Sequence, residues 1–252
     1  CFIANIISTI LATRFRSIKL QNEQVEVKEG VREYFRQLGE AIRFTKKSKR
    51  IFCLLLYFGL VSGLIYNLTT FRSSVLEGIS IPEHYFGIIF AISQMVAAIC
   101  AKAQIFIYKR FRNKTLAVLG IPLTISCIII GFLAMIGTST TFKVIIVLLF
   151  VFQGAIEGAY NVLIYRYLNN FTNRKIRTKL ATIRNMFYNI SSILISLFGA
   201  MLLNYTDSAN TIIIVGCMMT ILIILLLDYM RGKVGLKPEQ YKKEDLKYMH
   251  KK

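Results

Sequence analysis

The chain has 252 residues, and its 32 Lys and Arg residues outnumber its 13 Asp and Glu residues to give a formal net charge of +19. Yet 55% of the residues are hydrophobic and only 18% are charged, whereas a typical soluble domain has about 25% charged residues. This combination excludes an ordinary soluble domain. It is typical of a protein whose apolar segments lie in lipid while basic residues gather in the loops on one side.

The sequence lacks the motifs of metal-dependent and nucleotide-dependent enzymes. Its two histidines, His84 and His250, are far apart, and its five cysteines show no spacing typical of a metal site. It contains neither a P-loop nor a GxGxxG motif. We therefore expect no metal site, no cofactor and no catalytic residues, and the chain is not predicted to be an enzyme.

An apolar run opens the chain. Residues 1–12 are too few to cross a bilayer and stop before Arg14, and a secretory signal would carry its basic residues ahead of the apolar run. We expect residues 1–13 to be the end of a membrane helix that starts before this chain. Residues 14–50 then form a cytoplasmic loop. Helical spacing of apolar residues over about 31–45 predicts an amphipathic helix there, either on the membrane surface or solvated as a connector.

Six apolar runs follow, each long enough to cross a hydrocarbon core of about 30 Å as a helix. We predict membrane helices at about 51–71, 86–108, 115–137, 143–165, 180–203 and 211–230. The predicted fold is therefore an all-α, polytopic six-helix membrane bundle over residues 51–230, followed by a basic tail at 231–252.

Basic residues alternate between the two sides of this bundle. They concentrate in the segments 46–50, 109–114 and 166–179 and in the tail, whereas the opposite loops hold only Arg72 and Lys143. The positive-inside rule places the loops that are rich in basic residues, and the C-terminus, in the cytoplasm. The chain is thus predicted to be a multi-pass protein of the cell membrane. Because these charges flank lipid-embedded segments, we do not expect nucleic acid as a partner.

Polar residues inside spans tend to face the bundle interior or a cavity. They share one face of the first, second, fourth and fifth spans, while the third and sixth are nearly apolar and are predicted to face lipid. Two such three-span units of opposite orientation are the layout of many secondary transporters. The candidate substrate-pathway residues are Tyr66, Asn67, Thr70, Gln94, Gln153, Glu157, Tyr160, Asn161, Asn185 and Asn189.

Glu157 stands out because a carboxylate inside a span is costly unless it is paired, protonated or hydrated. It is a candidate proton-coupling group or a contact for a cationic substrate, or else a structural partner of a basic or amide side chain on a neighbouring span. Asn67 and Asn161 leave a similar choice between cavity lining and interhelical hydrogen bonding.

The loop between the fourth and fifth spans carries Tyr167-Leu168-Asn169, followed by Arg177, Leu180, Ile183 and Met186, and this pattern resembles a segment of the major facilitator superfamily. There a YxN helix end is followed by RATxLSxxxM at the start of the eleventh helix. The matching residues of this family motif are Asn169, Arg177, Leu180, Ile183 and Met186. Thr178, Lys179 and Thr182 depart from the pattern, and the loop at 109–114 lacks the glycine and the aspartate that the family places there.

The resemblance implies that the chain is the C-terminal half of a carrier of the bacterial permease type, with the six spans as helices seven to twelve. It further implies a partner half of six helices that is missing here, contact with the lipid bilayer, and a small-molecule substrate. The implied function is secondary active transport of a drug, sugar or other metabolite by alternating access, as a symporter or antiporter.

Two other functions are open to the sequence. A non-catalytic membrane subunit of an ATP-driven transport or assembly complex would need a cytoplasmic coupling element, and only the helix at about 31–45 is available for that. A membrane enzyme would need a nucleophile with a base or a metal-ligating pair within the spans, and the sequence offers neither.

Overall fold

The computed structural model describes the backbone of Arg36, Gly39 and residues 49–111, 114–137, 139–170 and 174–231. By its contacts the chain divides into two compact units, residues 1–37 and 38–252. Only Arg36 is described in the first unit, so everything below concerns the second. The predictions for residues 1–13, for the loop and amphipathic helix within 14–50 and for the tail after Arg231 fall outside the described residues and stay predictions.

Six long helices make up the described part of the second unit, and no strand occurs within the ranges just given. They are α3 (Lys49–Gly78), α4 (Phe86–Phe111), α5 (Thr115–Ile136), α6 (Thr140–Asn170), α7 (Arg174–Leu203) and α8 (Ser208–Arg231), with a short 3₁₀ turn, η1 (Glu83–Tyr85), before α4. All six are long and apolar enough to cross a membrane. This confirms the predicted all-helical membrane bundle.

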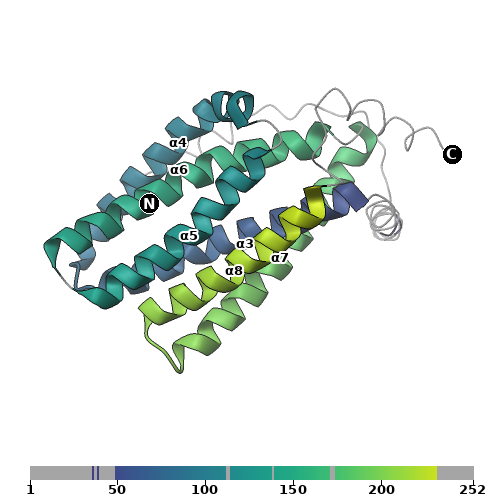
Figure 1. Cartoon of the computed structure of the whole chain (residues 1–252). Helices are drawn as coiled ribbons and strands as arrows, with labels where there is room; N and C mark the ends of the chain where they lie inside the picture. The colour runs from purple at the N-terminus through teal and green to yellow at the C-terminus, as the bar shows by residue number, and fades with distance from the viewer. Residues whose placement is uncertain are drawn as a thin grey trace, which may run out of the picture. The chain divides into compact units, whose positions relative to one another are not determined.

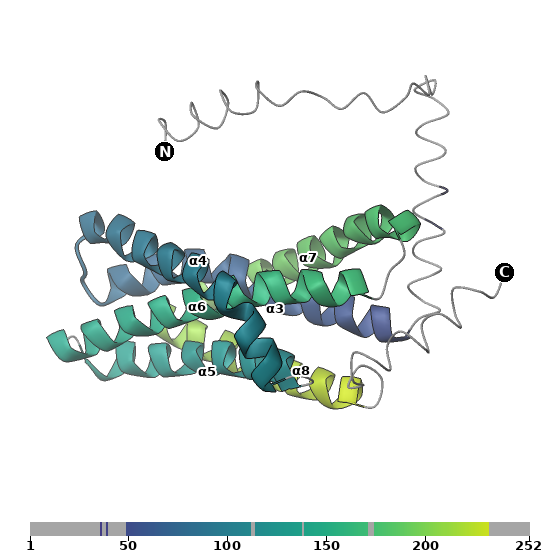
Figure 2. The ribbon, with the colours of Figure 1, turned by 90° about the horizontal axis from the view of Figure 1, so that it is seen from above.

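The helices lie side by side along roughly one direction (Figures 1 and 2). Such long continuous helices form because hydrocarbon offers the backbone no hydrogen-bond partner, so each N–H and C=O must be satisfied within its own segment. Helix α3 has 30 residues, which at 1.5 Å per residue is about 45 Å, longer than the hydrocarbon core. It therefore has room for polar residues near both of its ends.

The end of α3 is a defined capping structure. The N–H of Ile81 donates to the carbonyl of Leu76 at 3.0 Å, and the N–H of Ser80 donates to that of Glu77 at 2.9 Å. Ser80 has a φ of 55°, the left-handed conformation that a Schellman cap requires. Pro82 follows and prevents the helix from continuing.

Helix α3 runs through the middle of the bundle and contacts α5, α6, α7 and α8. Within its apolar window 78% of the residues are buried, against 17% for α4 and 22% for α7. The sequence predicted α5 and α8 as the lipid-facing helices. That stays a prediction; the structure packs α5 and α8 closely on each other, and the smallest buried shares belong to α4 and α7.

Glycines allow the closest helix contacts. A Cβ on Gly158 of α6 would overlap the carbonyl oxygen of Ala97 on α4, and one on Gly154 would lie 2.7 Å from the carbonyl oxygen of Ser93. On the other side of the bundle, a Cβ on Gly59 of α3 would lie 2.8 Å from the carbonyl oxygen of Phe187 on α7. These glycines serve close backbone packing, as small residues do in membrane helices.

Candidate functional site

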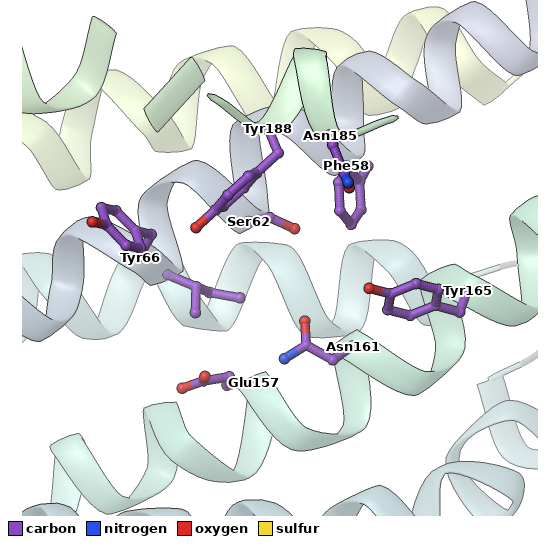
Figure 3. A pocket seen from close by; sticks show the side chains of 9 residues that line it. Phe58, Ser62, Tyr66, Glu157, Asn161, Tyr165, Asn185 and Tyr188 are labelled. Carbon is purple, nitrogen blue, oxygen red and sulfur yellow. The ribbon is translucent and has the colours of Figure 1, made fainter. Parts of the chain in front are cut away.

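A cavity of about 480 Å³ lies between α3, α6 and α7 (Figure 3). Its walls combine aromatic rings, amides, a hydroxyl and one carboxyl group. The lining residues are Phe58, Ser62, Ile65, Tyr66, Glu157, Asn161, Tyr165, Asn185 and Tyr188. The size falls within the range of small-molecule sites, roughly 300–1,000 Å³.

Helical periodicity brings these side chains to one space. Glu157, Asn161 and Tyr165 are spaced by four along α6, so they lie one above the other on a single face. Asn185 and Tyr188 are spaced by three on α7 and meet them from the opposite side (Figure 3). The stripe of α6 therefore runs from a carboxyl group inside the bundle to a tyrosine at the end of the apolar span.

Glu157 lies eight residues, about 12 Å along the helix, before Tyr165, the last residue of the candidate membrane span in α6. Its Oε2 atom is buried and has no hydrogen-bond partner among the described residues. Buried polar atoms are nearly always hydrogen-bonded in native proteins. This carboxyl oxygen therefore lacks the partner that such atoms usually have.

A buried cation lies on the other side of Glu157. Arg72 is 2% exposed, and its guanidinium is close enough to Glu157 to interact with it electrostatically. No ion pair joins the two within the described part of the chain. Instead the Nε of Arg72 donates to Oε1 of Gln153 at 3.3 Å, and its guanidinium lies 5.9 Å from the ring centroid of Phe150.

The position of Arg72 corrects the sequence analysis. Arg72 was assigned to an external loop, because the apolar run of the first span ends at Phe71. The structure continues α3 to Gly78 and turns Arg72 into the bundle. A charged side chain is tolerated there because Gln153 accepts its hydrogen bond.

Gln153 extends this contact to a third helix. Its Nε2 donates to the Oγ of Ser126 at 2.9 Å and to the Sγ of Cys127 at 3.5 Å, both on α5. The side-chain amide of Gln153 thus accepts a hydrogen bond from α3 and donates hydrogen bonds to α5. It is a structural link behind the cavity and does not line it.

Asn67 makes a second polar link, between α3 and α7. Its Nδ2 donates to the carbonyls of Gly63 at 2.9 Å and Ser192 at 3.1 Å, and its Oδ1 accepts from the Oγ of Ser196 at 2.5 Å. Asn67 is only 5% exposed. Of the two roles open to it from the sequence, this geometry is that of an interhelical hydrogen bond.

Of the ten candidate pathway residues, the structure brings four into the cavity wall. These are Tyr66, Glu157, Asn161 and Asn185. Three others are buried between helices, namely Asn67, Gln153 and Tyr160. The remaining three, Thr70, Gln94 and Asn189, are exposed on the outside of the bundle.

Five lining residues were not among the candidates. They are Phe58, Ser62, Ile65, Tyr165 and Tyr188. The spacing of Tyr165 from Asn161 and of Tyr188 from Asn185 was a usable signal, since residues four or three apart share a helix face. The same spacing of four joins Ser62 to the candidate Tyr66 and Phe58 to Ser62, whereas Ile65 needed the rotation of α3, which only packing determines.

Aromatic contacts organise the cavity wall. The rings of Tyr66 and Tyr188 meet edge to face with centroids 6.0 Å apart. The guanidinium of Arg184 lies 4.2 Å from the ring centroid of Tyr165 and 5.4 Å from that of Phe58. Arg184 is held there by a 3.1 Å hydrogen bond from Nη2 to the Oδ1 of Asn185.

The predicted family motif lies at the junction of α6 and α7. Asn169 belongs to α6 and Arg177 to α7, and their side chains are outside the described part. Leu180 is buried at 4% exposure, whereas Met186 is exposed. Leu180 therefore packs into the core at the start of the α7 span.

A family model described as Major Facilitator Superfamily matches residues 108–248. No curated protein and no solved structure matches the chain. The matched segment runs from the end of α4 through α8, so it includes two of the three helices that form the cavity and the whole predicted motif. Because the match covers more than half of the 252 residues and agrees with six membrane-type helices, the chain belongs to the Major Facilitator Superfamily, a family of membrane transporters.

Proposed function

We propose that this bundle is one half of a secondary active transporter that moves a small solute by alternating access. The observation that carries the proposal is the cavity between α3, α6 and α7, with the side chain of Glu157 in its wall. Transporters of this kind bind their substrate near the membrane midplane between two helical units. The solute is a drug, a sugar or another metabolite.

The exposed faces of α4 and α7 support a second helical unit. Gln94 on α4 and Asn185 and Asn189 on α7 are polar and exposed, and such side chains are costly against hydrocarbon. A further six-helix bundle packed over α4 and α7 would enclose them in a hydrated interior. We propose that the complete carrier has this bundle N-terminal to the present one.

Glu157 is the proposed proton-coupling residue. Its side chain lines the cavity, and the guanidinium of Arg72 is close enough to interact with it electrostatically. A group that can hold either a proton or an ionic contact at the substrate site is able to link the two movements. The drive is then a proton gradient.

The distribution of basic residues supports a location and an orientation in the membrane. We propose a multi-pass protein of the cell membrane with the C-terminus in the cytoplasm, since the basic segments 46–50, 109–114 and 166–179 and the tail all fall on one side of the spans.

Alternating access is testable without knowing the substrate. Asn161→Cys places a thiol in the cavity wall, and Thr124→Cys places one at a buried position of α5. In the full-length protein with native cysteines replaced, we expect a membrane-impermeant maleimide to label Asn161→Cys from either face of the membrane and to leave Thr124→Cys unlabelled. Labelling of Asn161→Cys from one face alone would contradict alternating access.

A further inference from the structure

We propose that a groove at the start of α4 and α6 binds a membrane phospholipid, with one acyl chain in the groove and the phosphate at the ammonium group of Lys143. The groove has a volume of about 300 Å³ and is lined by the beginnings of the two helices and by Ile81 in the turn after α3. Six of its nine lining residues are Ile, Val or Leu, and the other three are Tyr85, Thr140 and Lys143. The lipid is a resident ligand and not the transported solute, so the inference does not depend on the proposed function.

On α6, the groove and the cavity lie on opposite sides of the contact with α4. Gly154 and Gly158 make this contact, because a Cβ on either would meet the backbone of α4. At about 100° per residue, Val144 and Leu148 fall to one side of these glycines and Asn161 falls to the other. Val144 and Leu148 line the groove, whereas Asn161 lines the cavity.

Helix α4 has the same division. Ser93 and Ala97 are the residues that meet the glycines of α6. By the same helical spacing, Ile89 and Ile92 fall to one side of this pair and the exposed Gln94 falls to the other. Ile89 lines the groove, so the apolar sides of α4 and α6 meet there. The α4–α6 pair therefore has one polar side and one apolar side.

The apolar side is the one suited to face hydrocarbon. Ile88, Val144 and Leu148 in the groove are 56%, 54% and 61% exposed. The second helical unit proposed above is needed over the polar side, where Gln94 lies. The groove is thus left open to the bilayer, whose acyl chains are the apolar material that can fill it.

Lys143 supplies the charge for a phosphate. Its Nζ donates to the carbonyl of Ser80 at 3.2 Å, and an ammonium group has three protons to donate. The described residues offer it no ion pair with an acid, and the first turn of α6, in which it lies, contains no acid. The partial positive charge of the helix N-terminus adds to its own. Two ammonium protons therefore remain for an anion.

The order of the lining residues matches the order of groups in a phospholipid. Lys143 lies in the first turn of the candidate span that begins at Thr140, which is the level of the headgroups. Leu148 lies five residues further along α6, about 7–8 Å deeper. Tyr85 lies beside the start of α4, and tyrosine is enriched at the membrane interface. A phosphate at Lys143 thus places the attached chain along Val144 and Leu148.

The phosphate must supply the selectivity of the site. Lipid tails are as apolar as the Leu and Ile side chains that they meet, so the groove accepts any similar chain about equally well. A lysine near an anionic lipid surface contributes about fivefold in binding. The decisive comparison is therefore between phosphatidylglycerol and a diacylglycerol with the same two chains, which lacks the phosphate.

Tryptophan fluorescence can report binding at this groove, because the 252 residues contain no Trp. Ile92→Trp places a reporter beside the groove at an exposed position of α4. The full-length protein, with any Trp outside these residues replaced, is reconstituted in vesicles that contain a small fraction of either lipid with brominated chains. Bromine quenches a nearby indole. We expect brominated phosphatidylglycerol to associate with this position about fivefold more strongly than the diacylglycerol.

A second reporter measures the lipid away from the groove. Phe132→Trp lies at an exposed position of α5 near the same end of the bundle, and there we expect no preference between the two lipids. Equal association of both lipids at Ile92→Trp would overturn the proposal. Absence of quenching by either lipid at Ile92→Trp would also overturn it, because protein would then cover the groove.

Variants in the Ile92→Trp background assign the preference to Lys143. Lys143→Gln should remove it, whereas Lys143→Arg keeps the charge and should retain it, which controls for folding. Lys109→Gln, at an exposed lysine near the other end of α4, should leave it unchanged. A preference that survives Lys143→Gln would contradict the proposed phosphate contact.

Discussion

Gln153 on α6 accepts a hydrogen bond of 3.3 Å from the Nε of Arg72 on α3, which makes an amide the partner of a fully buried cation inside the bundle. The same amide donates to Ser126 on α5 at 2.9 Å. One side chain thus joins three helices and compensates a charge that would otherwise be costly in a membrane protein.

Removing this amide should destabilise the bundle. We expect Gln153→Leu to lower the free energy of unfolding by about 2–4 kcal/mol, because Arg72 would be left buried without its acceptor. Thermal unfolding in detergent measures the effect. Gln94→Leu, at an exposed glutamine of α4, is the control and should change stability little. If Gln153→Leu is as stable as Gln94→Leu, the network does not hold Arg72.

The contact between α4 and α6 depends on glycine. A methyl group at Gly158 would overlap the carbonyl oxygen of Ala97, so Gly158→Ala should force the helices apart and cost about 1–3 kcal/mol. Gly87→Ala is the matched change, since nothing described lies within 4 Å of a Cβ placed there. It should be neutral or slightly stabilising, because alanine favours helix. A stable Gly158→Ala variant would show that α4 and α6 are less closely packed.

Asn67 should contribute to stability more than to substrate binding. Asn67→Leu removes the hydrogen bonds to Ser192 and Ser196 on α7, and we expect a loss of about 1–2 kcal/mol. Asn161→Leu removes an amide from the cavity wall and should lower transport activity with a smaller loss of stability. Thermal unfolding and a transport assay of the two variants separate these effects. The opposite pattern would mean that the roles of the two asparagines are exchanged.

This pair of asparagines shows what the sequence was able to predict. Both follow a tyrosine and two glycines in an apolar span, so periodicity alone gave them the same two interpretations. Their roles differ because α3 is turned by its packing on α7, whereas Asn161 faces open space. Rotation about a helix axis is set by contacts between segments far apart in the chain, and no single span encodes it.

The spans themselves were predictable, because a helix that crosses a bilayer needs about 20 apolar residues. Few other folds need such a run. The same rule led the sequence analysis to place Arg72 outside the span, because a charged residue directly after an apolar run looks like the end of a membrane helix. The acceptor that lets the helix continue past it, Gln153, lies 81 residues further along the chain. The family was predictable from the motif around Asn169 to Met186, and the match over residues 108–248 confirmed it.

The orientation in the membrane gives a further prediction. Tyr205→Cys lies in the turn between α7 and α8, and Lys114→Cys lies just before α5 at the opposite end of the bundle. In intact cells expressing a variant without native cysteines, we expect an impermeant maleimide to label Tyr205→Cys at once. Lys114→Cys should react only after the membrane is permeabilised. The reverse result would place the C-terminus outside the cell.

The central claim is that the carboxyl group of Glu157 couples proton movement to solute movement. The most direct measurement compares wild type and Glu157→Gln of the full-length carrier in proteoliposomes, for uphill accumulation under a proton gradient and for solute exchange without one. Our account predicts that Glu157→Gln abolishes uphill accumulation while exchange remains measurable. Uphill accumulation at the wild-type rate in Glu157→Gln would contradict it.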